Sequence, residues 1–186
     1  MPRNREVVRR LLQQAALALY DKQGYEQTTT AEIAAQAGVT ERTFFRHFAD
    51  KREVLFGGEE LLIGMLVNAI QNAPAHLGLL DTLLVAFKAA EPVFIENQPL
   101  YEPLRRIVSS SPALQERHLA KVQAMTVALT MALRERGATE HMASLAAQMG
   151  MSAISHAILA WHKERAGTPN EHLEKVFQDM RALSTN

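Results

Sequence analysis

Hydroxyl, cationic and aromatic side chains gather between Thr40 and Phe48 in a pattern that suits contact with phosphate groups. At helical spacing Phe44 and Phe48 share one inner face of a short helix. The outer face then carries Thr40, Arg42, Thr43, Phe45, Arg46 and His47. Hydroxyls and cations bind phosphate oxygens, and a helix with one dry face and one such polar face fits a groove of DNA. The pattern favours nucleic-acid recognition.

The element that positions this short helix is a second one immediately before it. Thr29 followed three residues later by Glu32 is a capping box, which starts a helix. Gly38 stands where that helix must end in a left-handed conformation, and Thr40 can cap the next helix. The stretch 29–48 is therefore predicted to be a helix-turn-helix. The alternative is an ordinary helical hairpin that only packs in a bundle core.

Catalytic chemistry has little support elsewhere in the chain. Cysteine is absent, which excludes thiolate nucleophiles and cysteine metal sites. The remaining histidines are scattered, and none pairs with another at the i, i+4 spacing of helical metal ligands. Ser109–Ser111 is interpreted as a helix end and cap. No catalytic residue, metal site or cofactor is predicted, and an enzyme is not expected.

The composition is that of a globular chain without a strong charge. The 186 residues have a formal net charge of zero. Residues 1–55 hold nine Lys and Arg against seven Asp and Glu, so any DNA contact must come from a few well-placed donors. The N-terminus does not resemble a signal peptide, and the apolar run 61–67 is too short to span a membrane. We expect a cytoplasmic protein with no membrane partner.

The chain as a whole is predicted to be all-α, with about nine helices and no sheet. Outside the helix-turn-helix, apolar periodicity and caps predict helices at 3–23, 51–71, 79–96, 100–108, 112–136, 139–165 and from 169 onward. Domain boundaries are predicted at 1–49 for the helix-turn-helix part and 50–186 for a larger helical part.

The residues from about 5 to 56 resemble the N-terminal domain of the TetR family of bacterial transcriptional repressors. The resemblance rests on Thr28–Thr30, Ile33-Ala34, Ala37-Gly38-Val39-Thr40, Thr43-Phe44-Phe45-Arg46-His47-Phe48, Lys51 and Val54-Leu55, which align without a gap. Beyond residue 56 only the length and the all-helical pattern are similar to the family. The resemblance implies that 1–49 is a DNA-binding domain and that 50–186 is a ligand-binding and dimerisation domain.

The resemblance implies DNA-binding roles for seven residues. Thr29 would hold a phosphate at a helix N-terminus, where the helix dipole favours an anion. The groove-facing residues would be Thr40, Arg42 and Thr43, with Arg42 the best candidate for guanine O6 and N7. The residues against the sugar-phosphate backbone would be Phe45, His47 and Lys51. Glu41 either accepts from cytosine N4 or simply occupies the helix N-terminus, and the second interpretation is preferred.

A homodimer is expected, because two recognition helices about 34–36 Å apart match successive major grooves of a pseudo-palindromic operator. Small residues at steps of four, three and four would let helices approach closely. The predicted interface comprises Ala146, Met149, Gly150, Ala153, Ala157, Phe177 and Met180. The alternative is that this stripe packs inside the monomer. We favour the dimer, mostly because of the resemblance.

A small-molecule effector site is implied by the resemblance alone, since middle helices of this family usually enclose one. Candidate lining residues are Met65, Phe87, Glu91, Phe94, Tyr101, Arg105, Met125, His156 and Trp161. For each apolar member, a place in the ordinary core is the stronger interpretation. The prediction is a repressor released from its operator by a small, mostly apolar ligand. The alternative is an all-helical scaffold whose helix-turn-helix is only structural.

Overall fold

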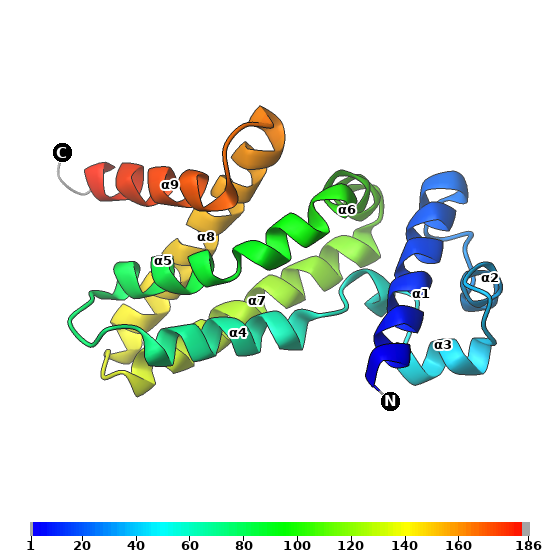
Figure 1. The fold of residues 1–186 in the computed structure, drawn as a ribbon, viewed down its shortest axis with the longest axis horizontal. Helices are drawn as coiled ribbons and strands as arrows, with labels where there is room; N and C mark the ends of the chain where they lie inside the picture. The colour runs from blue at the N-terminus through cyan, green and yellow to red at the C-terminus, as the bar shows by residue number, and fades with distance from the viewer. Residues whose placement is uncertain (1, 184–186) are drawn as a thin grey trace. The chain divides into compact units, whose positions relative to one another are not determined.

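The computed structural model describes residues 2–183, with side chains from residue 5 onward, and within that range all regular secondary structure is helical (Figure 1). Nine α-helices and one 3-10 turn follow one another: α1 Pro2–Gln23, α2 Thr30–Gln36, α3 Glu41–His47, η1 Glu53–Leu55, α4 Glu59–Asn72, α5 Leu79–Ala89, α6 Glu91–Ser110, α7 Pro112–Glu135, α8 Glu140–Glu164 and α9 Pro169–Leu183. The all-α prediction and the helix count are confirmed for the described residues.

Three predicted helices have other boundaries in the structure. The helix predicted at 79–96 is divided at Ala90 into α5 and α6. The helix predicted at 51–71 is interrupted: η1 ends at Leu55, and α4 begins only at Glu59. Between them Gly58 has φ +93°, a left-handed conformation that breaks a right-handed helix. Conversely, α6 continues through Pro99, where a break had been predicted. Residues 95–99 are exposed, so water can reach the carbonyl that loses its partner to the proline.

By compactness the chain divides into two units, each described here by itself. The first comprises residues 1–58 and 100–121, and the second comprises residues 59–99 and 122–186. Helices α6 and α7 contribute residues to both. Whether the functional domains fall at 1–49 and 50–186 stays a prediction.

The first unit packs α1, α2, α3 and η1 with the end of α6 and the start of α7 around one core. Fully buried members include Leu12, Ile33, Phe44 and Val54, and Leu114 of α7 is buried with them. Half-buried Arg117 of α7 donates two hydrogen bonds to the Glu53 carboxylate, at 2.5 and 3.0 Å. The start of α7 is therefore fixed to η1, the turn that follows α3.

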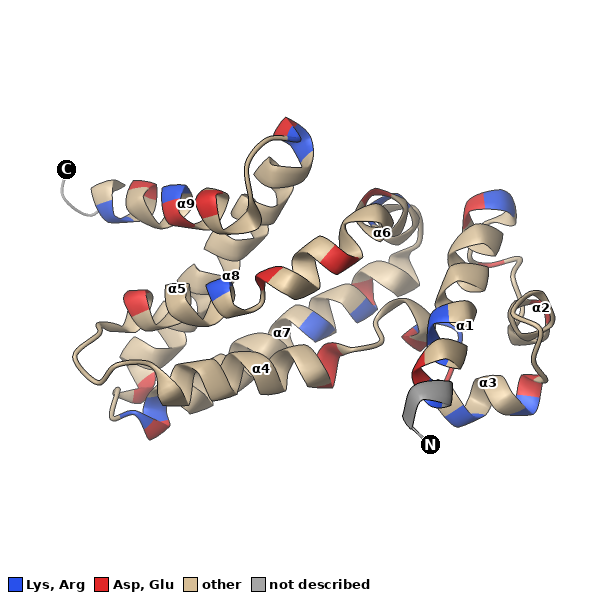
Figure 2. Cartoon of the chain, in the orientation of Figure 1, with Lys and Arg blue, Asp and Glu red and all other residues tan. Residues whose placement is uncertain are grey.

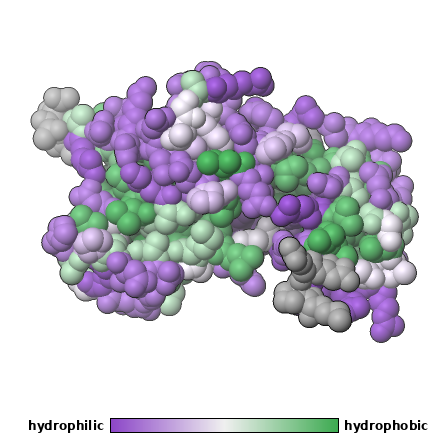
Figure 3. Space-filling view, in the orientation of Figure 1, coloured by the Kyte–Doolittle hydropathy of each residue, from purple (hydrophilic) through white to green (hydrophobic). Residues whose placement is uncertain are grey.

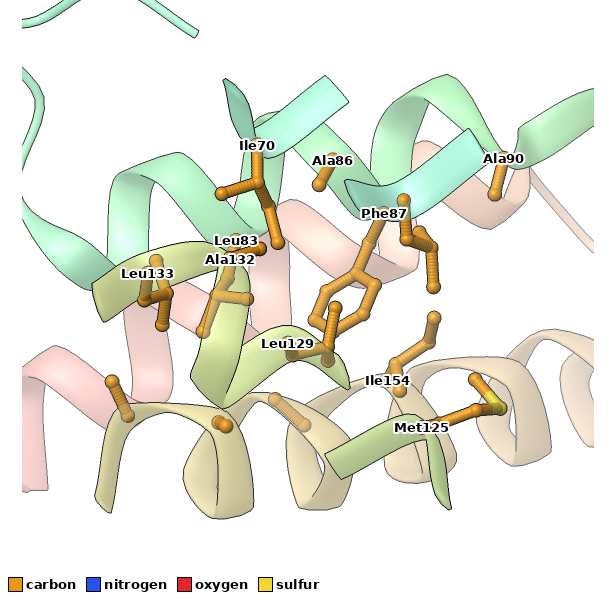
Figure 4. Close-up of a cluster of buried hydrophobic side chains, with 14 of the residues drawn as sticks. Ile70, Leu83, Ala86, Phe87, Ala90, Met125, Leu129, Ala132, Leu133 and Ile154 are labelled. Carbon is orange, nitrogen blue, oxygen red and sulfur yellow. The ribbon is translucent and has the colours of Figure 1, made fainter. Parts of the chain in front are cut away.

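The second unit has its own core, formed mainly by α4, α5, α7, α8 and α9. Figure 4 shows the Phe87 ring among Leu83, Leu129, Met125 and Ile154, all of them buried. Ion pairs from α9 to α5, Arg181 with Asp81 and Lys88 with Glu174, hold these two helices together at the surface. Hydrophobic residues also reach the surface beside hydrophilic ones (Figure 3).

Helix α8 is long and apolar enough to span a membrane by length and composition alone. One of its faces, however, is buried in the second unit's core, including Ala143, Ala147, Ile154 and Trp161. A central helix of a globular core has the same composition, so the burial of α8 accounts for its apolar character.

Candidate nucleic-acid interface

Helices α2 and α3 are each fixed at their start by the threonine that precedes them. The Thr29 hydroxyl accepts a hydrogen bond from the Glu32 amide, and the Glu32 carboxylate accepts one from the Thr29 amide at 2.8 Å, which completes the predicted capping box. Thr40 accepts from the Thr43 amide at 3.2 Å. Between the helices, Gly38 has φ +71°, as predicted for a left-handed helix end. The helix-turn-helix geometry is confirmed.

The inner faces of α2 and α3 are buried. Ile33, Ala34 and Phe44 are completely or almost completely buried, and Phe48 is 5% exposed. The rings of Phe44 and Phe48 lie 5.7 Å apart, and the Arg9 guanidinium of α1 sits 5.4 Å from the centre of the Phe48 ring. A seven-residue helix cannot persist alone, so this packing against α1 holds α3 in place.

The outer face of α3 carries two long cations and an aromatic ring. Arg42 and Arg46 are exposed, and neither has a hydrogen-bond or ion-pair partner among the described residues. Cations lie at both ends of α3 (Figure 2). Phe45 is 53% exposed and meets the buried Phe44 ring edge-on at 5.4 Å. A large exposed aromatic between two unpaired arginines is the arrangement expected of a face that contacts another molecule.

The hydroxyls of Thr40 and Thr43 form a separate pair, 3.0 Å apart, at the start of α3. Because these hydroxyls already bond to each other, Arg42 is the residue of this turn with the most unused donors. This favours the prediction that Arg42 makes the principal base contact.

His47 lies at the end of α3 in a cationic environment. Burial lowers the pKa of His47, and the nearby Arg5, Arg46 and Arg9 lower this pKa further. These effects favour the neutral form of the imidazole. In that state it can contribute one N–H to a phosphate but no charge.

Both hydrogen-bond donors of Thr29 are occupied within the protein. Its amide and its hydroxyl both donate to Glu32 Oε2, each at 2.8 Å. The amide hydrogen bond is the main cause that lowers the pKa of the Glu32 carboxyl. A phosphate at the N-terminus of α2 would thus compete with a carboxylate, so the predicted phosphate role of Thr29 requires Glu32 to move.

Lys51 makes several contacts inside the protein, whereas the resemblance implied a contact to the sugar-phosphate backbone. Its ammonium lies 4.3 Å from the centre of the Tyr25 ring. It donates to three carbonyl oxygens, those of Tyr25 at 2.9 Å, Glu26 at 3.3 Å and Thr28 at 3.1 Å. An ammonium has three N–H donors, and all three are occupied. Lys51 ties the loop between α1 and α2 to the segment after α3 and leaves no donor for the sugar-phosphate backbone.

Three further residues of this region were missed as site residues by sequence reasoning. Arg46 stood in the polar face but was not selected, although its position one turn after Arg42 could have indicated it. Thr30 donates to the Glu41 carboxylate, and Arg9 packs on Phe48. Neither of these contacts has a local signal, because both join residues far apart along the chain.

The nine predicted ligand residues are distributed over both units. Tyr101 and Arg105 belong to the first unit and the other seven to the second. Phe87 and Met125 are core residues, whereas Met65 and His156 are exposed. Phe94 packs against that core, Glu91 accepts from the Asn170 amide, and the Trp161 indole donates to the Gly167 carbonyl.

One hollow of about 270 Å³ lies on the outer face of α1. It is lined by Glu6, Val7, Arg10, Leu11 and Gln14. None of the nine predicted ligand residues belongs to this lining.

The small-residue stripe lies inside the monomer, so most of the predicted dimer interface was wrong. Ala146, Gly150, Ala153, Ala157 and Phe177 are buried in the second unit's core, while Met149 and Met180 are half-buried. A Cβ built on Gly150 would lie 2.9 Å from Leu83 Cδ1 and 3.2 Å from Phe87 Cε2. The stripe allows close approach, as expected, but of α5 from the same chain.

Among the described residues, no group of three or more His, Asp or Glu side chains is placed to hold a metal ion. The candidate site consists of α2, α3 and the polar outer face of α3. An all-helical chain with a capped helix-turn-helix and an exposed cationic second helix defines the class of helix-turn-helix DNA-binding proteins.

Comparison with known proteins finds a family with a similar helix-turn-helix. Residues 12–56 match the model of the bacterial regulatory proteins of the tetR family. Through this domain the chain is similar to the TetR family of transcriptional regulators. The HTH-type transcriptional regulator TcmR of Streptomyces glaucescens is 32% identical over 116 residues, which are 59% of this chain and 51% of that protein. The chain thus spans about half the length of the curated relatives it matches.

Solved structures extend the similarity of fold to the whole chain. A transcriptional regulator from Pseudomonas aeruginosa PAO1 is 23% identical with a TM-score of 0.66, covering 100% of this chain and 93% of that one. FadR of Thermus thermophilus, a TetR-family repressor in complex with lauroyl-CoA, is 22% identical with a TM-score of 0.55, covering 91% of each chain. These similarities establish the TetR-like fold, with an N-terminal helix-turn-helix and a C-terminal helical part.

Proposed function

We propose that this protein is a cytoplasmic transcriptional repressor that binds a pseudo-palindromic operator as a homodimer and leaves it when a small, mostly apolar ligand binds. The DNA-binding part of this proposal rests on the side chains of the outer face of α3. There Arg42 and Arg46 are exposed and unpaired among the described residues, on a helix whose other face is fixed by the buried Phe44.

DNA binding is tested by the salt dependence of affinity. Phosphate neutralisation releases counterions, so log K should fall linearly with log salt concentration, by about 0.9 per phosphate contacted. Arg42→Ala should weaken binding to a selected sequence by about 1–3 kcal/mol and relax selectivity at one base pair. Lys163→Ala, at the exposed end of α8, is the matched control and should change neither quantity. No binding to duplex DNA at 50 mM salt would favour the scaffold alternative.

The dimer surface we now propose is the outer face of α8. Its residues follow the three-four spacing of helices that pair along a seam: Met142, Leu145, Met149, Ser152, His156 and Leu159. Met142, Leu145 and Leu159 are 49%, 44% and 43% exposed, which is unfavourable for large apolar residues gathered on one face. A second copy that packs against this stripe would bury them, and α9 lies beside α8 to extend the surface (Figure 1).

Sedimentation of matched variants tests this surface. Leu145→Glu should convert a micromolar dimer to monomer, because it places a charge in the seam without changing the monomer core. Val85→Glu, on the exposed side of α5 at 39% exposure, should leave the dimer intact. A dimeric Leu145→Glu variant would contradict an interface on this face.

The effector is proposed from family similarity. The structurally similar FadR is complexed with lauroyl-CoA, a ligand with a long apolar chain. A ligand that binds the DNA-incompetent form more tightly would shift the population off the operator. Native mass spectrometry of the purified protein should show a mass above that of the bare dimer. Lauroyl-CoA is a defined probe for displacement of DNA.

A further inference from the structure

The carboxylate of Glu41 is held by the hydroxyl of Thr30 in a hydrogen bond of 2.5 Å. Thr30 is the first residue of α2 and Glu41 the first residue of α3, so the bond joins the starts of the two helices across eleven positions of the chain. Glu41 is exposed and Thr30 half-buried. The bond therefore lies at the surface of the helix-turn-helix.

We infer that Glu41 is a positioning residue of the DNA interface, which fixes the recognition helix α3 through Thr30 and does not read a base. The inference rests on the proposed DNA-binding function. The competing role is direct recognition, in which a glutamate accepts a hydrogen bond from cytosine N4 in the major groove. The two roles require opposite directions of the side chain.

The direction of the Glu41 side chain supports positioning. A carboxylate that reads a base must leave α3 toward the groove, whereas this one returns to α2. Among the described residues, this is also the only side-chain hydrogen bond that links α2 to α3. Both helices have seven residues, so their relative orientation depends on such tertiary contacts.

The charge of Glu41 has a second consequence. Glu32 is bonded to Thr29 and Glu41 to Thr30, so two carboxylates occupy the N-terminal turn of α2. The helix dipole stabilises them there, but each repels an approaching phosphate. Glu41 thus lowers affinity for every sequence alike while it keeps Arg42 in its orientation.

Three substitutions separate these effects. Glu41→Gln retains an acceptor for Thr30 but removes the charge, Glu41→Ala removes both, and Thr30→Val removes the donor and keeps the charge. Without DNA, amide hydrogen exchange in residues 38–44 should become about threefold to tenfold faster in Glu41→Ala and Thr30→Val. It should be unchanged in Glu41→Gln and in the control Glu116→Gln on α7. Unchanged exchange in Glu41→Ala would overturn the positioning role, whatever the protein does with DNA.

Selection from a library of random 30-base-pair duplexes gives the second readout. Glu41→Gln should select the same sequences as wild type and bind them about twofold to fivefold more tightly at 0.15 M salt, a gain that shrinks at 0.5 M. Glu41→Ala and Thr30→Val should broaden the preference at the base pairs that Arg42→Ala also affects. Loss of a cytosine preference at one position in Glu41→Gln would show direct readout and overturn the inference. A wild-type protein that selects no sequence would instead refute the proposed function, and the exchange result would still stand.

Discussion

Replacing Lys51 by methionine should destabilise the helix-turn-helix without removing a phosphate contact. The substitution keeps the apolar stem and deletes the ammonium, which donates to the carbonyls of Tyr25, Glu26 and Thr28 and lies over the Tyr25 ring. A hydrogen bond from a charged donor contributes about 1.5–3 kcal/mol when buried. Lys51 is half-buried, so water can replace part of that loss at the freed carbonyls. The expected cost is about 2–3 kcal/mol of unfolding free energy, including about 0.5–1 kcal/mol for the cation–π contact.

Urea unfolding followed by circular dichroism measures this cost, and the salt dependence of DNA binding measures the alternative. The structure predicts a lower midpoint with an unchanged salt slope at temperatures where the variant is folded. A DNA-contacting lysine predicts the reverse, with wild-type stability and a slope smaller by about 0.9. Lys22→Met, an exposed lysine of the same unit, is the control and should change the unfolding free energy by less than about 0.5 kcal/mol. Wild-type stability together with the reduced slope would refute the role derived for Lys51.

Three further predictions concern other contacts. Gly150→Leu should lower the free energy of unfolding by about 1–3 kcal/mol or more, because Leu83 Cδ1 and Phe87 Cε2 lie 2.9 and 3.2 Å from the added Cβ. Met149→Leu is the control. A change in oligomeric state without a loss of stability would contradict burial of Gly150 in the monomer. Because the pKa of His47 lies below its usual range, lowering pH from 7 toward 5 should add a positive charge and strengthen DNA binding in wild type. A His47→Gln variant that keeps the same pH dependence would assign the effect elsewhere. Arg117→Gln should lower the free energy of unfolding by about 1–2 kcal/mol, because it removes the hydrogen bonds to Glu53. In a double-mutant cycle, Arg117→Gln combined with Glu53→Gln should lower it by less than the sum of the two single substitutions.

Local signals predicted much of the fold. Helix starts at Thr29, Thr40 and Thr139 were visible in the sequence because a capping hydroxyl reaches only two or three residues ahead. The turn at Gly38 was visible because its left-handed conformation disfavours other residues. The inner positions Ile33 and Phe44 followed from helical periodicity, and both are completely buried.

Contacts between distant residues could not be predicted in this way. The spacing of Ala146, Gly150 and Ala153 shows that another helix approaches closely, but it does not identify that helix as α5 of the same chain. The outer stripe of α8 has the same three-four spacing, so periodicity alone could not separate an intramolecular face from a proposed dimer face. Similarly, nothing near Lys51 indicates that three carbonyls more than twenty residues earlier will occupy its ammonium.

The distribution of these contacts also explains how a neutral chain can be proposed to bind DNA. Several of the nine cations in residues 1–55 are committed internally: Lys51 to carbonyls, Arg52 to Asp50, and Arg9 to the Phe48 ring. Arg42 and Arg46 remain unpaired on one face of α3. Because α3 carries only these two arginines, its non-specific attraction to phosphate should be weak, and Glu41 weakens it further. Specific binding must then depend on the orientation of α3, which explains why a surface hydrogen bond such as Thr30–Glu41 should affect sequence preference more than it affects stability.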